Sequence, residues 1–292
     1  MPKFMLEMLP TARKALVAVA AIATMNLIAV TAVHGNEATA DKLQLQGKLT
    51  QGALIIGSTE PGSEVKLNGE KLEVTPAGEF VFGFGRDAQL QHQLQVQLPD
   101  GSKIERALEL TQREYKVDRV DGVPASTVNP NPEQVKRSRQ DSEQVWLARQ
   151  TFSDRRDFLT PVIRPAEGRI SGVYGSQRIF NGEPRRPHFG LDIAAPTGTP
   201  VIAPWPGRVL LAVPDMFFSG GTLIIDHGYG VTTTYIHLHQ VLVEVGKDVN
   251  QGDIIAEIGA TGRVTGPHLD WRVNWQQEKL DPALLPYLFD ND

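Results

Sequence analysis

The segment between residues 170 and 270 contains no stretch of useful length with the 3.6-residue apolar period of a helix. Short runs rich in valine, isoleucine, leucine and threonine occur instead, at 209–213, 222–226, 231–236 and 253–258. Glycines punctuate these runs, at positions 220, 221, 228, 230, 246, 252, 259 and 262. Such runs bounded by glycine are typical of strands joined by turns. The pattern predicts a compact antiparallel β barrel or sandwich as the core of a domain over residues 161–292.

Residues 41–120 also have a β pattern, with strict alternation of apolar and polar residues at 43–49 and 90–98. Turn signals recur between the apolar runs, at 60–63, 67–69, 76–78 and 99–102. This spacing predicts a small immunoglobulin-like β-sandwich that serves as a binding or spacer module. Residues 121–160 read as a linker in which prolines precede one or two helices within 133–159. We therefore expect a mainly β protein with a short helical linker.

The first forty residues have the features of an export signal. Lys3, Arg13 and Lys14 precede an uncharged apolar run at 15–32, and small residues follow it. Residues 1–40 are predicted to be a cleaved signal peptide, with an uncleaved membrane anchor as the alternative. Either reading predicts an exported protein of the periplasm or cell envelope.

Charge and composition exclude several classes of protein. The net charge is -5 and the sequence has no basic stripe, which argues against nucleic acid as a partner. The chain has 0 cysteines, which excludes disulfides, thiolate zinc sites and cysteine nucleophiles.

Histidines and aspartates gather in the C-terminal part of the chain, where five of the 7 histidines lie at or after position 188. His188 and Asp192 are four residues apart, beside Pro187 and around Gly190. A straight strand would separate them by about 13 Å, too far to share one ion with bonds near 2 Å. We therefore expect the chain to bend between them, at the glycine.

Two further pairs have the two-residue spacing that places side chains on one face of a strand: His268 with Asp270, and His237 with His239. Together with His188 and Asp192, they predict a transition-metal site. A serine hydrolase is disfavoured because no Gly-x-Ser-x-Gly elbow is present. A glycosidase would leave the histidines without a role. A lipoyl- or biotinyl-type carrier barrel lacks the motif that should surround its lysine near Lys247.

The same segments resemble the LytM/lysostaphin-type zinc endopeptidases, which cut peptidoglycan stem peptides or cross-bridges. The resemblance covers roughly residues 165–282. It rests on the segments 168–175, 188–200, 235–238, 245–252 and 259–269, in that order along the chain. It implies the β barrel or sandwich of that peptidase type.

The resemblance also implies a role for each residue that matches the family's motifs. His188 and Asp192 become zinc ligands, and His237 and His268 become catalytic. The third ligand, normally histidine, falls at Asp270. An aspartate can bind zinc, and its oxygen makes Mn²⁺ an alternative to Zn²⁺. A second solution makes His239 the ligand, with Asp270 as its hydrogen-bond partner.

The function implied by the resemblance is metal-dependent hydrolysis of peptide bonds in peptidoglycan, with stem or cross-bridge peptides as the substrates. The alternative is a weakly active or inactive LytM-type regulator that binds and activates a cell-wall amidase.

Overall fold

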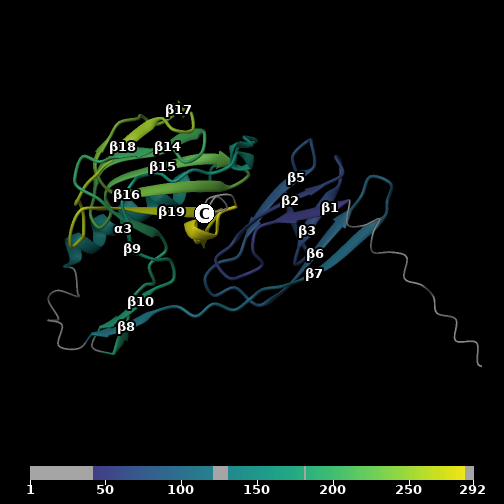
Figure 1. Ribbon diagram of the computed structural model, residues 1–292, viewed down its shortest axis with the longest axis horizontal. Helices are drawn as coiled ribbons and strands as arrows, with labels where there is room; N and C mark the ends of the chain where they lie inside the picture. Colours follow the sequence, from purple (N-terminus) through teal and green to yellow (C-terminus); the bar gives the residue numbers. More distant parts are fainter. Residues whose placement is uncertain (1–41, 121–130, 181, 287–292) are drawn as a thin grey trace, which may run out of the picture. The chain divides into compact units, whose positions relative to one another are not determined.

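The computed structural model describes residues 42–120, 131–180 and 182–286. The predicted signal peptide or anchor at 1–40 and residues 121–130 of the predicted linker lie outside these residues. Among the described residues, no helix has the length and apolar character needed to cross a membrane. The prediction of a mainly β protein is confirmed (Figure 1).

Residues 42–110 contain two antiparallel sheets that share one apolar core. One sheet has the order β1-β2-β5 and the other β4-β3-β6-β7. Their strands are β1 (Leu43–Gln46), β2 (Leu54–Thr59), β3 (Glu64–Leu67), β4 (Glu70–Leu72), β5 (Glu79–Gly83), β6 (Gln91–Gln97) and β7 (Lys103–Glu109). Alternation places Leu94 and Val96 of β6 in this core, together with Phe80 and Phe82 of β5. The predicted turn at Asn68 and Gly69 joins β3 to β4, and both residues have positive φ angles of 52° and 86°, which suits a two-residue hairpin.

A second region of sheet carries the histidine and aspartate clusters. It is a 10-stranded antiparallel sheet whose main path is β17-β14-β15-β16-β19-β12-β9, with β13, β18 and β20 off that path. The strands are β9 (Arg169–Gly172), β12 (Leu191–Ala194), β13 (Pro200–Ile202), β14 (Gly207–Met216), β15 (Gly220–Gly228), β16 (Val231–Val241), β17 (Asp248–Val249), β18 (Ile254–Ile258), β19 (His268–Trp275) and β20 (Glu278–Leu280). The four runs predicted to be strands fall within β14, β15, β16 and β18.

Alternation along β19 separates an apolar face from a polar face. Leu269, Trp271 and Val273 are fully buried in the main core, whereas His268, Asp270, Arg272 and Asn274 alternate with them on the other face. The polar face of this strand therefore carries the candidate chemistry, and the apolar face anchors it.

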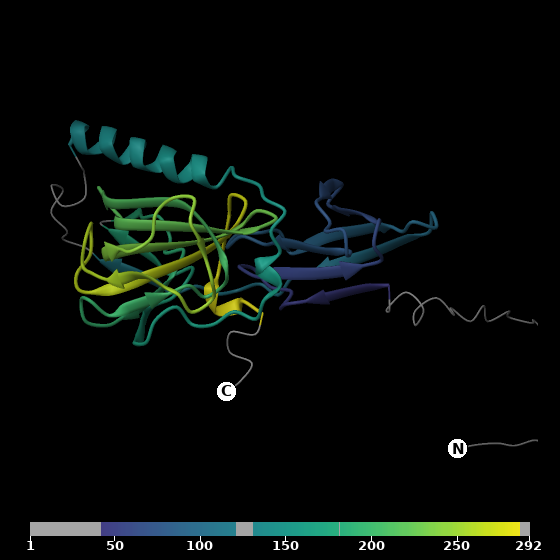
Figure 2. The same ribbon diagram turned by 90° about the horizontal axis from the view of Figure 1, so that it is seen from above.

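The single helix among the described residues, α3 (Pro132–Ala148), packs beside β14 (Figure 2). Asn131 caps it in a capping box with Gln134, and proline occupies its first turn. Arg137 contacts Asp215 of β14 at 2.7 Å. The short 3-10 turns η1 (Asp157–Leu159) and η2 (Pro282–Leu284) follow later in the chain.

One pairing is not visible in the local sequence pattern. Strand β8 (Val117–Val120), which follows the N-terminal sheets, pairs in parallel with β10 (Gln177–Phe180). Strand β10 also pairs with β11 (Glu183–Pro184). This small sheet leads directly into the segment that carries His188.

Candidate active site

His188, Asp192 and Asp270 come together, with one ligand atom of each within 4.8 Å of the others. The Nε2 atom of His188 lies 2.9 Å from Asp192 Oδ1 and 3.4 Å from Asp270 Oδ2. These residues are the three ligands predicted from the sequence. His239 is exposed and does not belong to this group.

The local backbone explains why the two aspartates and the histidine meet. Asp192 and Asp270 are direct partners in the antiparallel β12–β19 ladder, so their side chains project from the same face. His188 lies before β12, and its backbone N–H donates to Ser176 O at 2.8 Å. Its ring Nδ1 contacts Val173 O at 3.1 Å. That carbonyl accepts a hydrogen bond from Nδ1–H, which leaves Nε2 to face the carboxylates.

Two glycines leave the space that the aspartates occupy. A Cβ atom on Gly190 would lie 1.9 Å from Asp270 Oδ1. A Cβ atom on Gly172 would lie 2.2 Å from Asp192 Oδ2. Any side chain at either position would displace a proposed ligand, so these glycines are needed for packing as well as for chain direction.

His237 reaches the same face through a bulge in β16. The register between β15 and β16 shifts so that Ile236 and His237 lie opposite the single residue Thr222. His237 has a φ angle of 66°, a left-handed conformation that is costly for a side chain other than glycine. The imidazole ring then lies 4.9 Å, centroid to centroid, from the ring of His268. The bulge therefore pairs the two predicted catalytic histidines.

Backbone carbonyls fix the tautomers of both rings. Nδ1 of His237 lies 2.9 Å from Thr261 O, and Nδ1 of His268 lies 2.9 Å from Gly266 O. A carbonyl can only accept, so each Nδ1 carries the proton and each neutral ring has a free Nε2. Burial lowers the pKa of His237, which favours its neutral form. Nε2 of His268 lies 3.9 Å from Asp192 Oδ1.

Arg272 forms an ion pair with Asp270 that sequence reasoning did not identify. Its Nη2 lies 2.6 Å from Asp270 Oδ2, and its Nε lies 3.0 Å from Oδ1. Burial raises the pKa of Asp270, but the Arg272 guanidinium and the His188 ring outweigh it and hold this pKa well below its usual range. The spacing was a usable signal, because residues 270 and 272 lie on one face of a strand.

The three candidate ligands are arranged to bind a cation rather than to form hydrogen bonds with one another. His188 Nε2 and Asp192 Oδ1 are both buried, and neither makes a hydrogen bond of acceptable geometry. Burial lowers the pKa of His188, but the two carboxylates outweigh it and raise this pKa to about 10. The two carboxylates thus favour a positive charge at the centre that they share with His188 Nε2. This donor set and spacing fit Zn²⁺, or Mn²⁺.

Strands β10 and β11 form one antiparallel pair, and β14 and β15 form another. Residues 178–186 form most of β10 and β11, and residues 215–221 form the β14–β15 turn. Phe217 and Phe218 in that turn pack edge to face, with ring centroids 4.6 Å apart. The guanidinium of Arg263 lies 4.3 Å from the Phe218 ring.

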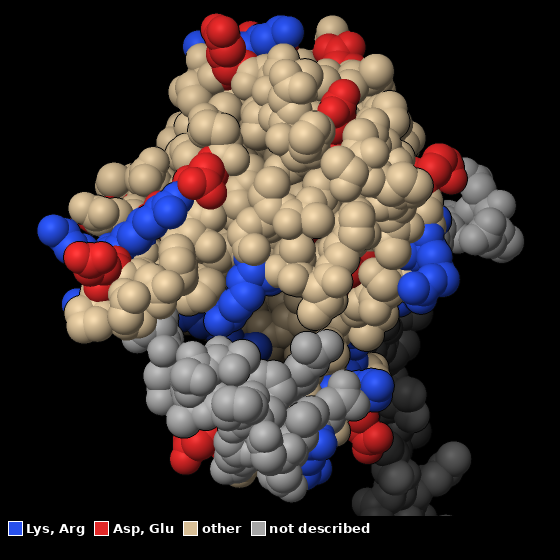
Figure 3. Space-filling view, turned by 90° about the vertical axis from the view of Figure 1, so that its left-hand side faces the viewer, with Lys and Arg blue, Asp and Glu red and all other residues tan. Residues whose placement is uncertain are grey.

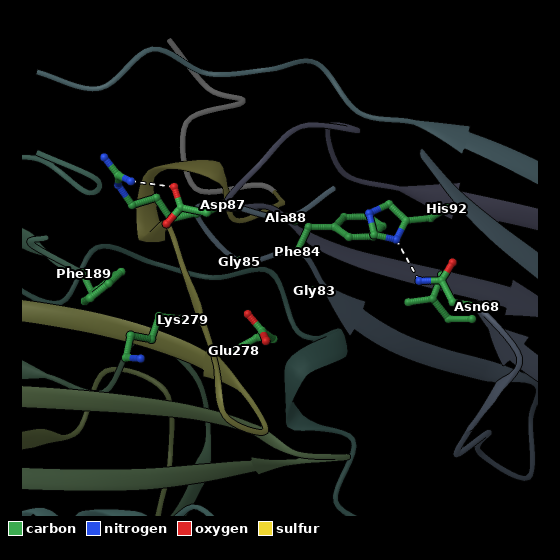
Figure 4. A pocket seen from close by; sticks show the side chains of 12 residues that line it. Asn68, Gly83, Phe84, Gly85, Asp87, Ala88, His92, Phe189, Glu278 and Lys279 are labelled. Atoms are coloured by element: carbon green, nitrogen blue, oxygen red, sulfur yellow. Dashed lines mark hydrogen bonds and ion pairs between the residues drawn. The ribbon is translucent and has the colours of Figure 1, made fainter. Parts of the chain in front are cut away.

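A cavity of about 480 Å³ lies apart from the metal ligands. Figure 4 shows His92 hydrogen-bonded to Asn68 on its wall. The His92 ring is partly buried, and its centroid lies 4.5 Å from that of Phe84. The cavity contains no metal-binding group of side chains within the described residues.

Comparison with known proteins agrees with this geometry. Residues 186–282 match the model of peptidase family M23. This segment is a peptidase family M23 domain. The matched range contains all three candidate metal ligands and both paired histidines, and the resemblance seen in the sequence is confirmed.

Two similar proteins are peptidoglycan DD-endopeptidases of Vibrio cholerae serotype O1. ShyB is 41% identical over 95 residues, which cover 32% of this chain and 22% of that protein. ShyA is 39% identical over 106 residues, covering 36% of this chain and 24% of that protein. The chain thus aligns with less than a quarter of the length of these relatives.

A solved structure extends the likeness beyond the M23 domain. It is a candidate peptidase M23 from Pseudomonas aeruginosa, with a TM-score of 0.63 and 26% sequence identity. The match covers 82% of this chain and 95% of that one. The arrangement of sheets described above therefore occurs in another protein described as a peptidase of this family.

Proposed function

We propose that this chain is an exported, metal-dependent endopeptidase that hydrolyses peptide bonds in peptidoglycan. The observation that carries the proposal is the convergence of His188, Asp192 and Asp270 around two buried atoms without hydrogen-bond partners, beside a pair of histidine rings. The substrate class is supported by the relatives, because both V. cholerae proteins are named as peptidoglycan DD-endopeptidases. Stem or cross-bridge peptides are the proposed targets.

In this proposal His188, Asp192 and Asp270 hold Zn²⁺, with Mn²⁺ as an alternative. A bound ion of this kind would supply Lewis acidity toward the scissile carbonyl and toward the attacking water. Two carboxylate ligands would by themselves weaken that effect, because they cancel the charge of the ion. Arg272 offsets one of them through its ion pair with Asp270. The two carboxylates and the guanidinium together carry a net charge of −1, as a site with two histidines and one aspartate would.

The two histidines have complementary roles in proton transfer. His237 is kept neutral by burial, and its free Nε2 accepts a proton from the attacking water. His268, once protonated, donates from Nε2 to the leaving amine. Each general acid or base of this kind typically contributes roughly 10²- to 10⁴-fold to the rate.

The test is digestion of purified peptidoglycan by the full chain, with and without a chelator, followed by mass spectrometry of the products. We expect new peptide termini, their loss with the chelator, and their return when Zn²⁺ or Mn²⁺ is added. Equal digestion with and without the chelator would exclude the metal-dependent mechanism.

A regulator of a cell-wall amidase is the second candidate function. The observation that favours it is the Arg272 guanidinium, which already occupies both oxygens of Asp270. A regulator should purify without stoichiometric metal, should release no peptide products, and should increase the rate of an added amidase. Metal analysis of the purified protein therefore separates the two functions.

Two assignments from the sequence remain proposals. We propose that residues 1–40 direct export, either as a cleaved signal or as an anchor. We also propose that 41–120 and 161–292 are separate domains joined by 121–160. Detection of the processed N-terminus in an envelope fraction tests the first, and limited proteolysis tests the second.

A further inference from the structure

Arg149 lies near the candidate active site without a carboxylate partner. It follows α3, and its Nη2 donates to Thr234 Oγ1 at 2.9 Å. Its Nε is buried and has no hydrogen-bond partner. Thr234 on β16 is the direct ladder partner of Arg272 on β19. The Arg149 guanidinium is therefore held at the position of the sheet next to Arg272.

The charge of Arg149 is not balanced within the described part of the chain, because no carboxylate there forms an ion pair or hydrogen bond with it. Burial, followed by repulsion from Arg272, lowers the pKa of Arg149 to about 10. The guanidinium is still charged at neutral pH. A largely buried charge without a counter-ion is costly, and an arriving anion would remove that cost.

Lys279 of β20 adds a third cation. It pairs with Asn274 of β19, two residues beyond Arg272. Burial and the charges of Arg149, Arg186 and Arg272 lower the pKa of Lys279, and Glu278 opposes them. The Nζ of Lys279 lies 4.8 Å from the ring centroid of Phe189, and Figure 4 shows both side chains. Phe189 directly follows the candidate ligand His188. Lys279 therefore lies beside the segment that carries a candidate ligand.

One face of the molecule carries a group of basic side chains. Figure 3 shows Lys and Arg side chains around a hollow in one face of the molecule, with most Asp and Glu side chains away from it. The net charge of the whole chain is -5. Local positive charge in an acidic protein indicates selection of an anionic group rather than general attraction of polyanions.

We propose that Arg149, Arg272 and Lys279 form a carboxylate-binding subsite that holds an acidic group of the peptide substrate. The proposal rests on the proposed peptidase function and specifies its substrate. Arg272 pairs directly with Asp270, and Arg149 is held one strand away from it, on the ladder partner of Arg272. Neighbouring strands are about 5 Å apart, and an extended peptide covers about 7 Å in two residues, so the carboxylate belongs one or two residues from the scissile bond. The planar donor fork of arginine suits a carboxylate.

The experiment compares two peptide substrates that differ at one group. One carries a free carboxylate on the residue beside the scissile bond, and its twin carries a carboxamide there. With the Zn²⁺-loaded full chain we expect kcat/KM to be roughly 10- to 100-fold higher for the free acid, the range for hydrogen bonds to a charged group. Arg149→Gln should lower this ratio toward one, and Arg149→Lys should restore part of it.

Arg137→Gln is the matched control, because Arg137 forms an ion pair with Asp215 away from the ligands. It should keep the wild-type ratio. Equal cleavage of both twins by the wild-type chain would overturn the subsite and leave the peptidase function standing. An unchanged ratio in a folded Arg149→Gln protein would also overturn it.

Failure of the peptidase function would look different, because neither twin would then be cleaved. In that case binding of the two twins is measured by titration calorimetry. Tighter binding of the free acid that Arg149→Gln removes would support the subsite, and equal binding of the twins would refute it.

Discussion

Replacement of Gly190 by alanine tests the candidate metal site without altering any proposed ligand or catalytic histidine. The added Cβ would lie 1.9 Å from Asp270 Oδ1 and 2.9 Å from both Arg272 Cγ and Trp271 O. The first separation is far shorter than a non-bonded contact allows. The Asp270 side chain is only 3% exposed and is held by the guanidinium of Arg272. It therefore has no free volume into which it could rotate.

The structure gives the scale of the expected effects. One methyl group forced into a packed site typically costs about 1–3 kcal/mol of stability. Loss of ligand orientation typically lowers metal affinity or activity by roughly 10- to 100-fold. Gly190→Ala should therefore remain folded with a lower denaturation midpoint, bind Zn²⁺ at least about tenfold more weakly, and lose hydrolysis in parallel. Urea unfolding, competition with a chromophoric chelator and peptidoglycan digestion measure these three quantities.

Gly266→Ala is the control for this experiment. Gly266 lies two residues before His268, yet a Cβ atom there would meet nothing within 4 Å. The substitution also keeps the carbonyl that accepts the His268 Nδ1–H. It should behave like the wild type in all three assays. Metal affinity and hydrolysis within about threefold of wild type in Gly190→Ala would refute the placement of Asp270 as a ligand.

Three further substitutions give separate tests. Asp270→Ala should lose its bound metal, and Asp270→His should retain it, as measured by elemental analysis. Metal retained in the alanine variant would assign the ligand role to His239. His237→Gly and His237→Ala should both lose hydrolysis. In thermal unfolding the glycine variant should be about 1 kcal/mol more stable than the alanine variant, because the φ angle of 66° at this position favours glycine. Equal stability of the two variants would argue against the left-handed bulge. His227 is buried and its pKa is lowered to about 4, below the ordinary value near 6.5 of an unfolded chain. The contribution of neutral His227 to the free energy of unfolding is fully present above pH 6.5. This free energy should fall by about 3 kcal/mol as the pH drops from 6.5 to 4, because the unfolded chain binds the proton first. Urea unfolding measured across this pH range should show that the free energy of unfolding depends less steeply on pH in His227→Gln than in the wild type. An identical pH dependence in the two proteins would contradict the lowered pKa of His227.

Much of the fold could be predicted because it depends on local signals. Apolar runs bounded by glycines identified the long strands β14, β15 and β16. The Asn68-Gly69 pair marked a turn, and the positive φ angles found there are ones that few other residues adopt. The pairing of β8 with β10 has no such signal, since residues 117–120 meet residues 177–180 only after the intervening chain has folded. Strand partners at that separation are fixed by tertiary packing, which composition and period do not encode.

The candidate site also combines a feature that can be predicted from the sequence with one that cannot. The bend between His188 and Asp192 follows from ligand distance and from Gly190, which are both readable in the sequence. The bulge at His237 is not readable, because a histidine gives no sign that it will adopt a left-handed conformation. That bulge nevertheless decides which rings meet, since it places His237 beside His268.

Charge balance links the aspartate at position 270 to arginines that the motif does not include. An aspartate in place of a histidine adds one negative charge to the ligand set, and Arg272 on the same strand face supplies the opposite charge. Arg149 then adds a second cation next to Arg272, although it is 123 residues away in the sequence (272 − 149). One arginine is enough to balance the extra aspartate, so the second requires an anion from outside the described chain. A substrate carboxylate is the anion that a peptidoglycan peptidase would meet at that position.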